Sequence, residues 1–184
     1  MVRPRTPKGR ARETFARLSE EYPDARCELD HRNPYELLAA TILSAQCTDA
    51  RVNMVTPALF ARYPTPEDLA VARPDDVEEL VRSTGFYKNK TRSLIGMAQA
   101  LVERYHGEVP SAMKDLVTVP GVGRKTANVV RSVAMDLPGL PVDTHVGRLA
   151  LRLGLTTESD PVKVEMELNP MVPACDRGLF SLLL

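Results

Sequence analysis

The sequence predicts an all-α protein, and three observations support this fold class. Hydrophobic residues recur with helical spacing along nearly the whole 184-residue chain. The strict alternation of apolar and polar residues that marks exposed strands is missing, and the chain has no Asn-Gly hairpin turn. Several segments begin with a capping residue followed by proline, as helices commonly do. We therefore expect about ten helices joined by short loops.

The first strongly apolar segment, residues 33–46, begins with Asn33 as N-cap and Pro34 as its first helical residue. Apolar residues occupy several faces of this helix, which predicts that it is largely buried. A later helix has acidic residues in its first turn, where the helix dipole favours them, and Gly85 after its end. Further helices are expected over residues 50–61, 65–72, 73–83, 89–105, 111–119, 124–135, 144–153 and 161–169.

The net charge is balanced, because 24 basic residues face 24 acidic ones. This balance argues weakly against a protein that holds nucleic acid by net charge alone. The distribution is uneven, since residues 82–92 are basic without any acid and residues 67–79 are acidic. Basic side chains also fill residues 1–17: Arg3, Arg5, Lys8, Arg10, Arg12 and Arg17. These basic segments could be local nucleic-acid-binding patches or simply solvated helix faces, and the sequence leaves both alternatives open.

The cysteines indicate a reducing compartment. Cys27, Cys47 and Cys175 are widely spaced, and they form neither a disulfide framework nor a complete metal site. No apolar run has the length of a membrane-spanning helix, and the basic N-terminus lacks the apolar segment of a signal peptide. We therefore expect a cytoplasmic protein without a membrane partner, associated with the nucleoid if the source is bacterial.

The segment "VPGVGRKTANVV", residues 119–130, is the most informative motif. A phosphate-binding loop is excluded because Arg124 separates Gly123 from Lys125 and the first glycine stands too close to the second. A dinucleotide-binding fingerprint is excluded because no strand precedes the segment. A helix–turn–helix unit remains, with Gly121 and Gly123 in the turn. Unpaired N–H groups at the start of the second helix could clamp a phosphate. A plain glycine turn between packed helices is the alternative.

Lys125 is in an unusual place for a cation, the first turn of a helix. The helix dipole and the neighbouring Arg124 both favour the neutral amine, which can act as a nucleophile and form a Schiff base. The alternatives are a lysine that contacts phosphate and a lysine that is simply solvated.

Asp143, in "PVDTHVGRLALRLGL", comes just before a helix and is expected to be its N-cap. A geometric argument allows a second role. The helix from Arg124 to Met135 advances about 17 Å, and the loop that follows can return by about 23 Å when extended. The chain is therefore long enough to bring Asp143 beside Lys125, where a carboxylate could orient the amine or accept a proton.

These motifs resemble the endonuclease III family of bifunctional DNA glycosylase/AP lyases, within the helix–hairpin–helix glycosylase superfamily. The likeness rests on "VPGVGRKTANVV", "VDTHVGR" and "LLAATILSAQCTDARVN" in the same order, with "STGFYKNKT" and "HGEVP" as further support. It extends over about residues 10 to 168. The resemblance implies removal of oxidised pyrimidines from double-stranded DNA and strand cleavage at the abasic site by β-elimination, performed by a monomer.

The resemblance also implies roles for particular residues. Lys125 is the expected nucleophile, Asp143 its assistant, and Gln46 the side chain that fills the space left by the extruded base. Ser44, Asp49 and Phe86 are candidates for the lesion pocket, and Phe86 stands where a second wedge is expected, although a core position is equally open. The other expected DNA-binding residues are Gly121, Val122, Gly123, Arg124, Thr126 and His145.

The resemblance further implies two helical domains with the active site in the cleft between them. Residues 27–137 would form a six-helix domain that contains the hairpin, about 112–135, and residues 1–26 with 138–184 would form the other. The family carries four cysteines for a [4Fe–4S] cluster, and these 184 residues do not contain them. We therefore expect a chain that is truncated before the cluster, with an incomplete second domain.

Two other functions are considered. A monofunctional adenine glycosylase would carry a glutamate where this chain has Ala40 and would lack Lys125. A helix–hairpin–helix module that binds DNA without catalysis would not require both Lys125 and Asp143, and both are present. The sequence therefore favours the lyase.

Overall fold

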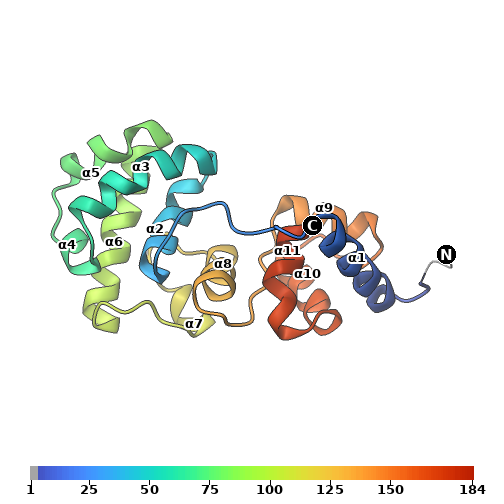
Figure 1. Ribbon diagram of the computed structural model, residues 1–184. Helices are drawn as coiled ribbons and strands as arrows, with labels where there is room; N and C mark the ends of the chain where they lie inside the picture. Colours follow the sequence, from blue (N-terminus) through green and yellow to red (C-terminus); the bar gives the residue numbers. More distant parts are fainter. Residues whose placement is uncertain (1–3) are drawn as a thin grey trace. The chain divides into compact units, whose positions relative to one another are not determined.

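The structure is a computed structural model that describes residues 4–184, and within this range every regular element is a helix (Figure 1). The all-α prediction is confirmed. Arg3 of the basic N-terminal segment lies outside the described residues. None of the helices in the described part of the chain is long and apolar enough to cross a membrane.

The chain divides into two compact units. Unit 2 is the continuous stretch Glu28–Val130, and unit 1 combines the chain up to Cys27 with Arg131–Leu184. The division falls inside one helix, whereas the sequence placed it after residue 137 by assigning that whole helix to the hairpin domain.

In unit 2, the long helix α6 packs against α2, α4 and α5, and α3 packs against α2 and α5. The core of this unit is made of large aliphatic side chains such as Leu38, Leu43, Leu94 and Met97, none of which is exposed. The elements are α2 (Pro34–Ser44), α3 (Asp49–Arg62), α4 (Pro66–Ala70), α5 (Pro74–Val81), the 3-10 helix η1 (Arg82–Thr84), α6 (Tyr87–Tyr105), α7 (Met113–Leu116) and the start of α8 (Arg124–Ala134).

The helix starts in unit 2 follow the capping signals of the sequence. The Asn33 side chain accepts a hydrogen bond from the Glu36 N–H at 2.9 Å, as expected of an N-cap. Thr65 and Asp68 form a reciprocal capping box at the start of α4. These local bonds explain why the helix starts could be predicted without knowledge of the packing.

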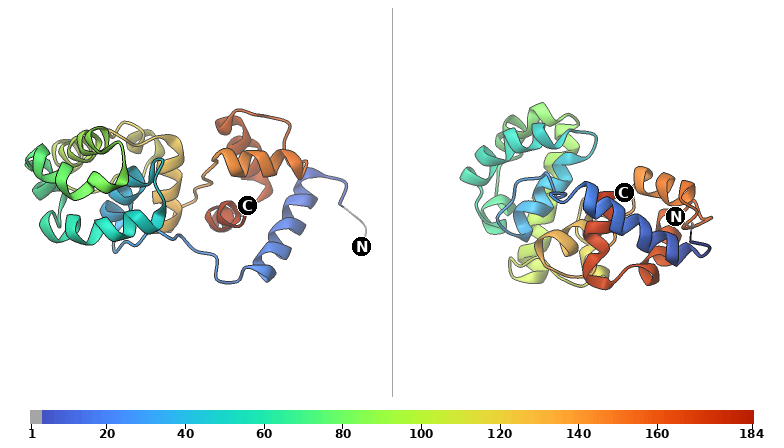
Figure 2. Two further views of the ribbon diagram at one scale, coloured as in Figure 1. Left: turned by 90° about the horizontal axis from the view of Figure 1, so that it is seen from above. Right: turned by 45° about the vertical axis from the view of Figure 1, so that its right-hand side comes forward.

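Unit 1 has its own core, which brings α1 against the C-terminal helix (Figure 2). Phe180 of that helix is fully buried and meets Phe15 of α1 edge-on, with ring centroids 5.8 Å apart. The elements of this unit are α1 (Pro7–Glu21), α9 (Thr144–Arg152), α10 (Pro161–Leu168), the 3-10 helices η2 (Asn169–Met171) and η3 (Ala174–Asp176), and α11 (Arg177–Leu183).

Helix α1 was not among the helices expected from the sequence. It nevertheless has a recognisable start, because the Thr6 hydroxyl accepts from the Gly9 N–H at 3.1 Å and Pro7 follows. The high density of basic residues concealed the narrow apolar stripe that includes Ala11 and Phe15. Tertiary burial of that stripe makes this segment part of a core.

Candidate functional site

The hairpin consists of α7, a glycine turn and α8, and the structure docks its turn onto the body of unit 2. Gly121 has φ 79°, a left-handed conformation that favours glycine. A Cβ added there would lie 2.9 Å from Cβ of Ser93 on α6 and 3.3 Å from Cδ1 of Ile42 on α2. Gly121 is therefore required by backbone conformation and by close packing inside the protein.

Gly123 differs, because a Cβ at this position would meet nothing within 4 Å and its φ is not left-handed. Among the described residues, the N–H groups of Gly121 and Gly123 donate to no backbone carbonyl, whereas Val122 donates to the Val119 carbonyl at 3.1 Å. Val122 is also 6% exposed. At the turn, the amides of Gly121 and Gly123 are without a backbone acceptor among the described residues, and Gly123 faces open space. The Val122 side chain, in contrast, is part of the core.

Lys125 is exposed in the first turn of α8 and lies within electrostatic reach of a carboxylate in the same unit. That carboxylate is Asp49, the first residue of α3. Partial burial raises the pKa of Asp49, the carboxylate of Glu28 raises it further, and the positive charge of Lys125 lowers it. Asp49 is therefore within electrostatic reach of both Glu28 and Lys125, which come from two other segments.

The Glu28 segment is fixed to α3 by one side chain. Asn53 donates from Nδ2 to the Glu28 carbonyl at 2.7 Å, and its Oδ1 accepts from the Asp30 N–H at 3.0 Å. Asp49 is held at the helix start by its neighbour Thr48, whose hydroxyl accepts from the Arg51 N–H at 3.3 Å. Sequence reasoning missed Glu28 and Asn53, since no local motif connects either of them with the hairpin.

Three exposed residues of unit 2, Gln46, Phe86 and His106, have left-handed backbones although none is glycine, and His106 is the C-cap of α6. Gln46, between α2 and α3, has φ 53°, and Phe86, immediately before α6, has φ 47°. Such conformations are uncommon in non-glycine residues and tend to occur at functional sites. Phe86 is 65% exposed, so its alternative assignment to the core is wrong. Ser44 ends α2 and donates its hydroxyl to the Thr41 carbonyl at 3.0 Å.

Asp143 belongs to unit 1, where it is the N-cap of α9, as the sequence predicted. Its Oδ1 accepts from the Val146 N–H at 2.8 Å. His145 is exposed in the first turn, and its Nδ1 lies 2.7 Å from a guanidinium nitrogen of Arg148. The start of α9 therefore combines a half-buried carboxylate with an exposed pair of an imidazole and a guanidinium group.

Arg124 and Thr126 flank Lys125 at the start of α8, and both are half-buried. The other face of this helix is apolar, with Ala127 and Val130 fully buried. The amphipathic character of α8 thus turns the cations of its first turn away from the core.

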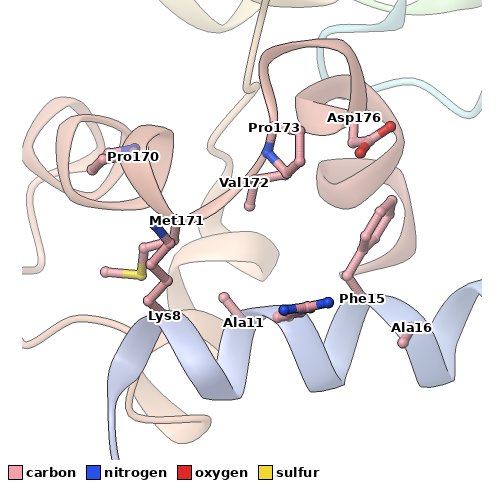
Figure 3. A pocket seen from close by; sticks show the side chains of 10 residues that line it. Lys8, Ala11, Phe15, Ala16, Pro170, Met171, Val172, Pro173 and Asp176 are labelled. Atoms are coloured by element: carbon pink, nitrogen blue, oxygen red, sulfur yellow. The ribbon is translucent and has the colours of Figure 1, made fainter.

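A separate pocket of about 610 Å³ lies in unit 1, between α1 and the segment around η2 and η3 (Figure 3). Apolar side chains including Phe15 and Val172 line it, and Lys8, Arg12 and Asp176 are its charged residues. It contains none of the candidate site residues, so its volume says nothing about the hairpin.

The residues of this chain do not fit an iron–sulfur cluster. Such a cluster requires four thiolates, and the chain has three cysteines. Cys47 lies in unit 2, whereas Cys27 and Cys175 belong to unit 1. In the described range, no group of three or more potential metal-ligating side chains comes together.

Comparison with known proteins places this geometry in context. Residues 39–174 match the family described as HhH-GPD superfamily base excision DNA repair protein. The chain is 51% identical to endonuclease III of Synechocystis over 95% of its own length and 80% of that relative's. It is 46% identical to endonuclease III of Bacillus subtilis over 87% of this chain and 74% of that one.

Solved structures agree with the sequence matches. One, titled as a trapped endonuclease III–DNA covalent intermediate, superposes with a TM-score of 0.90 at 44% identity. A second, titled as a non-covalent endonuclease III–DNA complex, also has a TM-score of 0.90, at 43% identity. Each comparison covers 96% of this chain and 83% of the other.

Proposed function

This chain belongs to the HhH-GPD superfamily of base excision DNA repair proteins, and from that premise we propose that it is a DNA glycosylase with AP lyase activity. Its substrate would be double-stranded DNA that contains an oxidised pyrimidine or an abasic site, and it would act as a monomer. The family identity supports the repair function, and the hairpin lysine supports the lyase step.

The observation that carries the proposal is the placement of Lys125. Its exposed amine follows a turn whose glycine amides have no backbone acceptor among the described residues, and Gly123 leaves the turn open to close approach. A DNA phosphate held by these amides would bring the sugar of the neighbouring nucleotide near the amine. One of the similar structures is titled as a trapped covalent DNA intermediate, which is the product class that such a lysine would form.

The chemistry begins with the Lys125 amine as the nucleophile. The nitrogen attacks C1′ of the damaged nucleotide as the C1′–base bond breaks, and the base leaves with the bonding electrons and takes up the proton that the amine loses. The C1′–O4′ bond then breaks, O4′ takes up a proton, and the opened sugar is joined to the lysine as a protonated Schiff base. This iminium acidifies the neighbouring C2′ proton, and loss of that proton expels the 3′ phosphate by β-elimination. We assign Asp143 the role of assisting the amine and stabilising the positive charge that develops.

The exposed loops support entry of the protein into the DNA helix. Gln46 is proposed to occupy the space left by the extruded nucleotide, and exposed Phe86 to act as a second wedge. Asp49 and Ser44 flank the Gln46 loop and are proposed to line the lesion pocket. The amides of Gly121 and Gly123 and the side chains of Arg124, Thr126 and His145 are proposed to contact the DNA backbone.

Borohydride trapping on a duplex with one abasic site tests the proposal. Wild type should form a covalent complex, and Lys125→Ala should form none, because the Schiff-base nitrogen is lost. Lys114→Ala is the matched control, since Lys114 is an exposed lysine on the other helix of the hairpin. Its loss removes the same charge and should leave trapping intact.

The same experiment separates the rival functions. A wild-type protein that binds the duplex but never traps would be a binding module, and the lyase proposal would be wrong. A monofunctional adenine glycosylase would release adenine without trapping. The glutamate that this rival requires is missing, because position 40 on α2 is an alanine.

A further inference from the structure

Gln46 and Phe86, two of the exposed left-handed residues of unit 2, need contacts that maintain their conformation. Gln46 and Phe86 are not glycines, so their positive φ values are unfavourable unless surrounding contacts maintain them. Their loops lie between packed elements, because α3 packs against η1 and α2 packs against α6. The contacts that hold these loops can therefore be sought at the place where these helices meet.

Lys90, near the start of α6, holds the Phe86 loop from both of its ends. Its backbone N–H donates to the Phe86 carbonyl at 3.1 Å, and its Nζ donates to the Thr84 carbonyl at 2.7 Å. The intervening Gly85 has φ 71° and provides the sharp reversal between the two carbonyls. One residue thus fixes the backbone on either side of the exposed aromatic ring.

The turn that carries Gln46 is closed by its own backbone. The Cys47 N–H donates to the Ser44 carbonyl at 3.0 Å, which closes the turn around Gln46. The hydrogen bonds of Lys90, in contrast, act on the loop that carries Phe86.

Lys90 is a costly residue to have at this position. Lys90 is 5% exposed. Burial lowers the pKa of its amine, because the buried ammonium loses its hydration. An apolar side chain of similar length would avoid this cost and is often tolerated in place of a buried charge. A buried ammonium is therefore expected where its directed hydrogen bond fixes the backbone, as the bond to the Thr84 carbonyl does here.

We propose that Lys90 is a positioning residue that holds the Phe86 loop in place, so that the Phe86 side chain is preset to enter the DNA helix. The inference rests on the proposed function, in which Phe86 supports extrusion of a nucleotide. Lys90 itself touches no reacting atom. Its contribution is to reduce the ordering that the loop would otherwise undergo when DNA binds.

Two abasic substrates test this role. A duplex requires the protein to occupy the space beside the extruded sugar, whereas a single strand with the same abasic site does not. Lys90→Met removes the donor and the charge but keeps the length of the side chain. We expect the single-turnover rate of β-elimination to fall about tenfold on the duplex and less than about twofold on the single strand.

The matched control is Lys88→Met, which removes an exposed cation from the first turn of the same helix. If the loss of positive charge alone mattered, the duplex rate would fall in both variants. This fall in rate would become smaller when salt is added. The positioning role predicts a change in the ratio of duplex to single-strand rates for Lys90→Met alone. An unchanged ratio in a folded Lys90→Met protein would overturn the inference.

A double-mutant cycle that combines Lys90→Met with Phe86→Ala separates an effect on the position of Phe86 from an effect on stability. Once the aromatic wedge is removed, Lys90→Met should have a smaller further effect on the duplex rate, whereas independent effects would multiply and refute the proposal. If Lys90→Met does not fold, Lys90→Gln retains a neutral donor and is put through the same cycle. A wild type that cleaves neither substrate contradicts the proposed function instead, so the two failures are distinguishable.

Discussion

The segments that contain Lys125 and Asp143 differ in how much of their chemistry the fold itself uses. Lys125 is exposed, and the glycine turn before it leaves Gly123 without packing neighbours. Asp143 is half-buried, and its carboxylate accepts from the Val146 N–H at 2.8 Å to begin α9. The lysine segment is therefore open toward a partner, whereas the aspartate segment also has a structural task.

This difference teaches that equal importance in a reaction does not imply equal tolerance of substitution. Loss of an exposed lysine changes folding stability little. Loss of a capping carboxylate leaves a helix-terminal N–H group without its acceptor. The two functional groups should consequently be separable by comparing activity with thermal stability.

The largest effect is expected for Asp143, whose two tasks can be divided by two substitutions. Asn caps helices as well as Asp does, so Asp143→Asn should keep the melting temperature and lower the β-elimination rate about a hundredfold. Asp143→Ala should lose the same activity and also about 1 kcal/mol of stability. Rates on an abasic duplex and thermal unfolding measure the two effects.

Asp160→Asn is the control for this prediction. Asp160 caps α10 in the same unit by accepting from the N–H groups of Val162 and Lys163, both at 3.0 Å. Its replacement should change neither activity nor stability. If Asp143→Asn retains full activity, the catalytic role of Asp143 is wrong and only the cap remains.

The two glycines of the hairpin differ in the same way, because Gly121 is packed inside the protein and Gly123 faces open space. Gly121→Ala should destabilise unit 2 by about 1–3 kcal/mol, because a left-handed φ is imposed on alanine and the new Cβ meets Ser93. Gly123→Ala should change stability by less than about 0.5 kcal/mol. Its methyl group should instead weaken binding to an abasic duplex about threefold to tenfold.

Denaturant unfolding and fluorescence anisotropy of labelled DNA distinguish these outcomes. Equal effects of both substitutions on stability would show that Gly123 also has a packing role. Unchanged DNA affinity in Gly123→Ala would contradict close approach of the phosphate at that residue.

The smallest effect is expected for Asp49. Its pKa in the folded protein is raised above the ordinary value of an aspartate, chiefly by burial, so the folded state favours the protonated acid. A raised acid pKa lowers stability as pH rises through the interval between the unfolded and folded values. Asp49→Asn should therefore match wild type in acid and be slightly more stable at neutral pH.

Thermal unfolding from about pH 4 to about pH 7 measures this difference. A stability advantage of wild type that grows with pH would contradict the prediction. Asn53→Ala releases the Glu28 segment from α3, and Glu28 contributes to the raised pKa of Asp49. In an Asn53→Ala background, the Asp49→Asn substitution should therefore change stability less than it does in the wild-type background.

The sequence by itself determined the features that depend on local chemistry. Helix starts at Asn33, Thr65 and Asp143 follow from side chains that bond to amides three residues away. The hairpin and the position of Lys125 at a helix start are likewise local, because the glycines and the helical periodicity stand within one short segment.

Only the tertiary structure decided which surfaces remain available. It separated Gly121, which is packed against α2 and α6, from Gly123, although the two glycines look equivalent in the sequence. It brought Glu28 and Lys125 within electrostatic reach of Asp49, and it set Gln46 and Phe86 in left-handed conformations. These features depend on contacts between residues far apart in the chain, whose energies no local pattern of residues encodes.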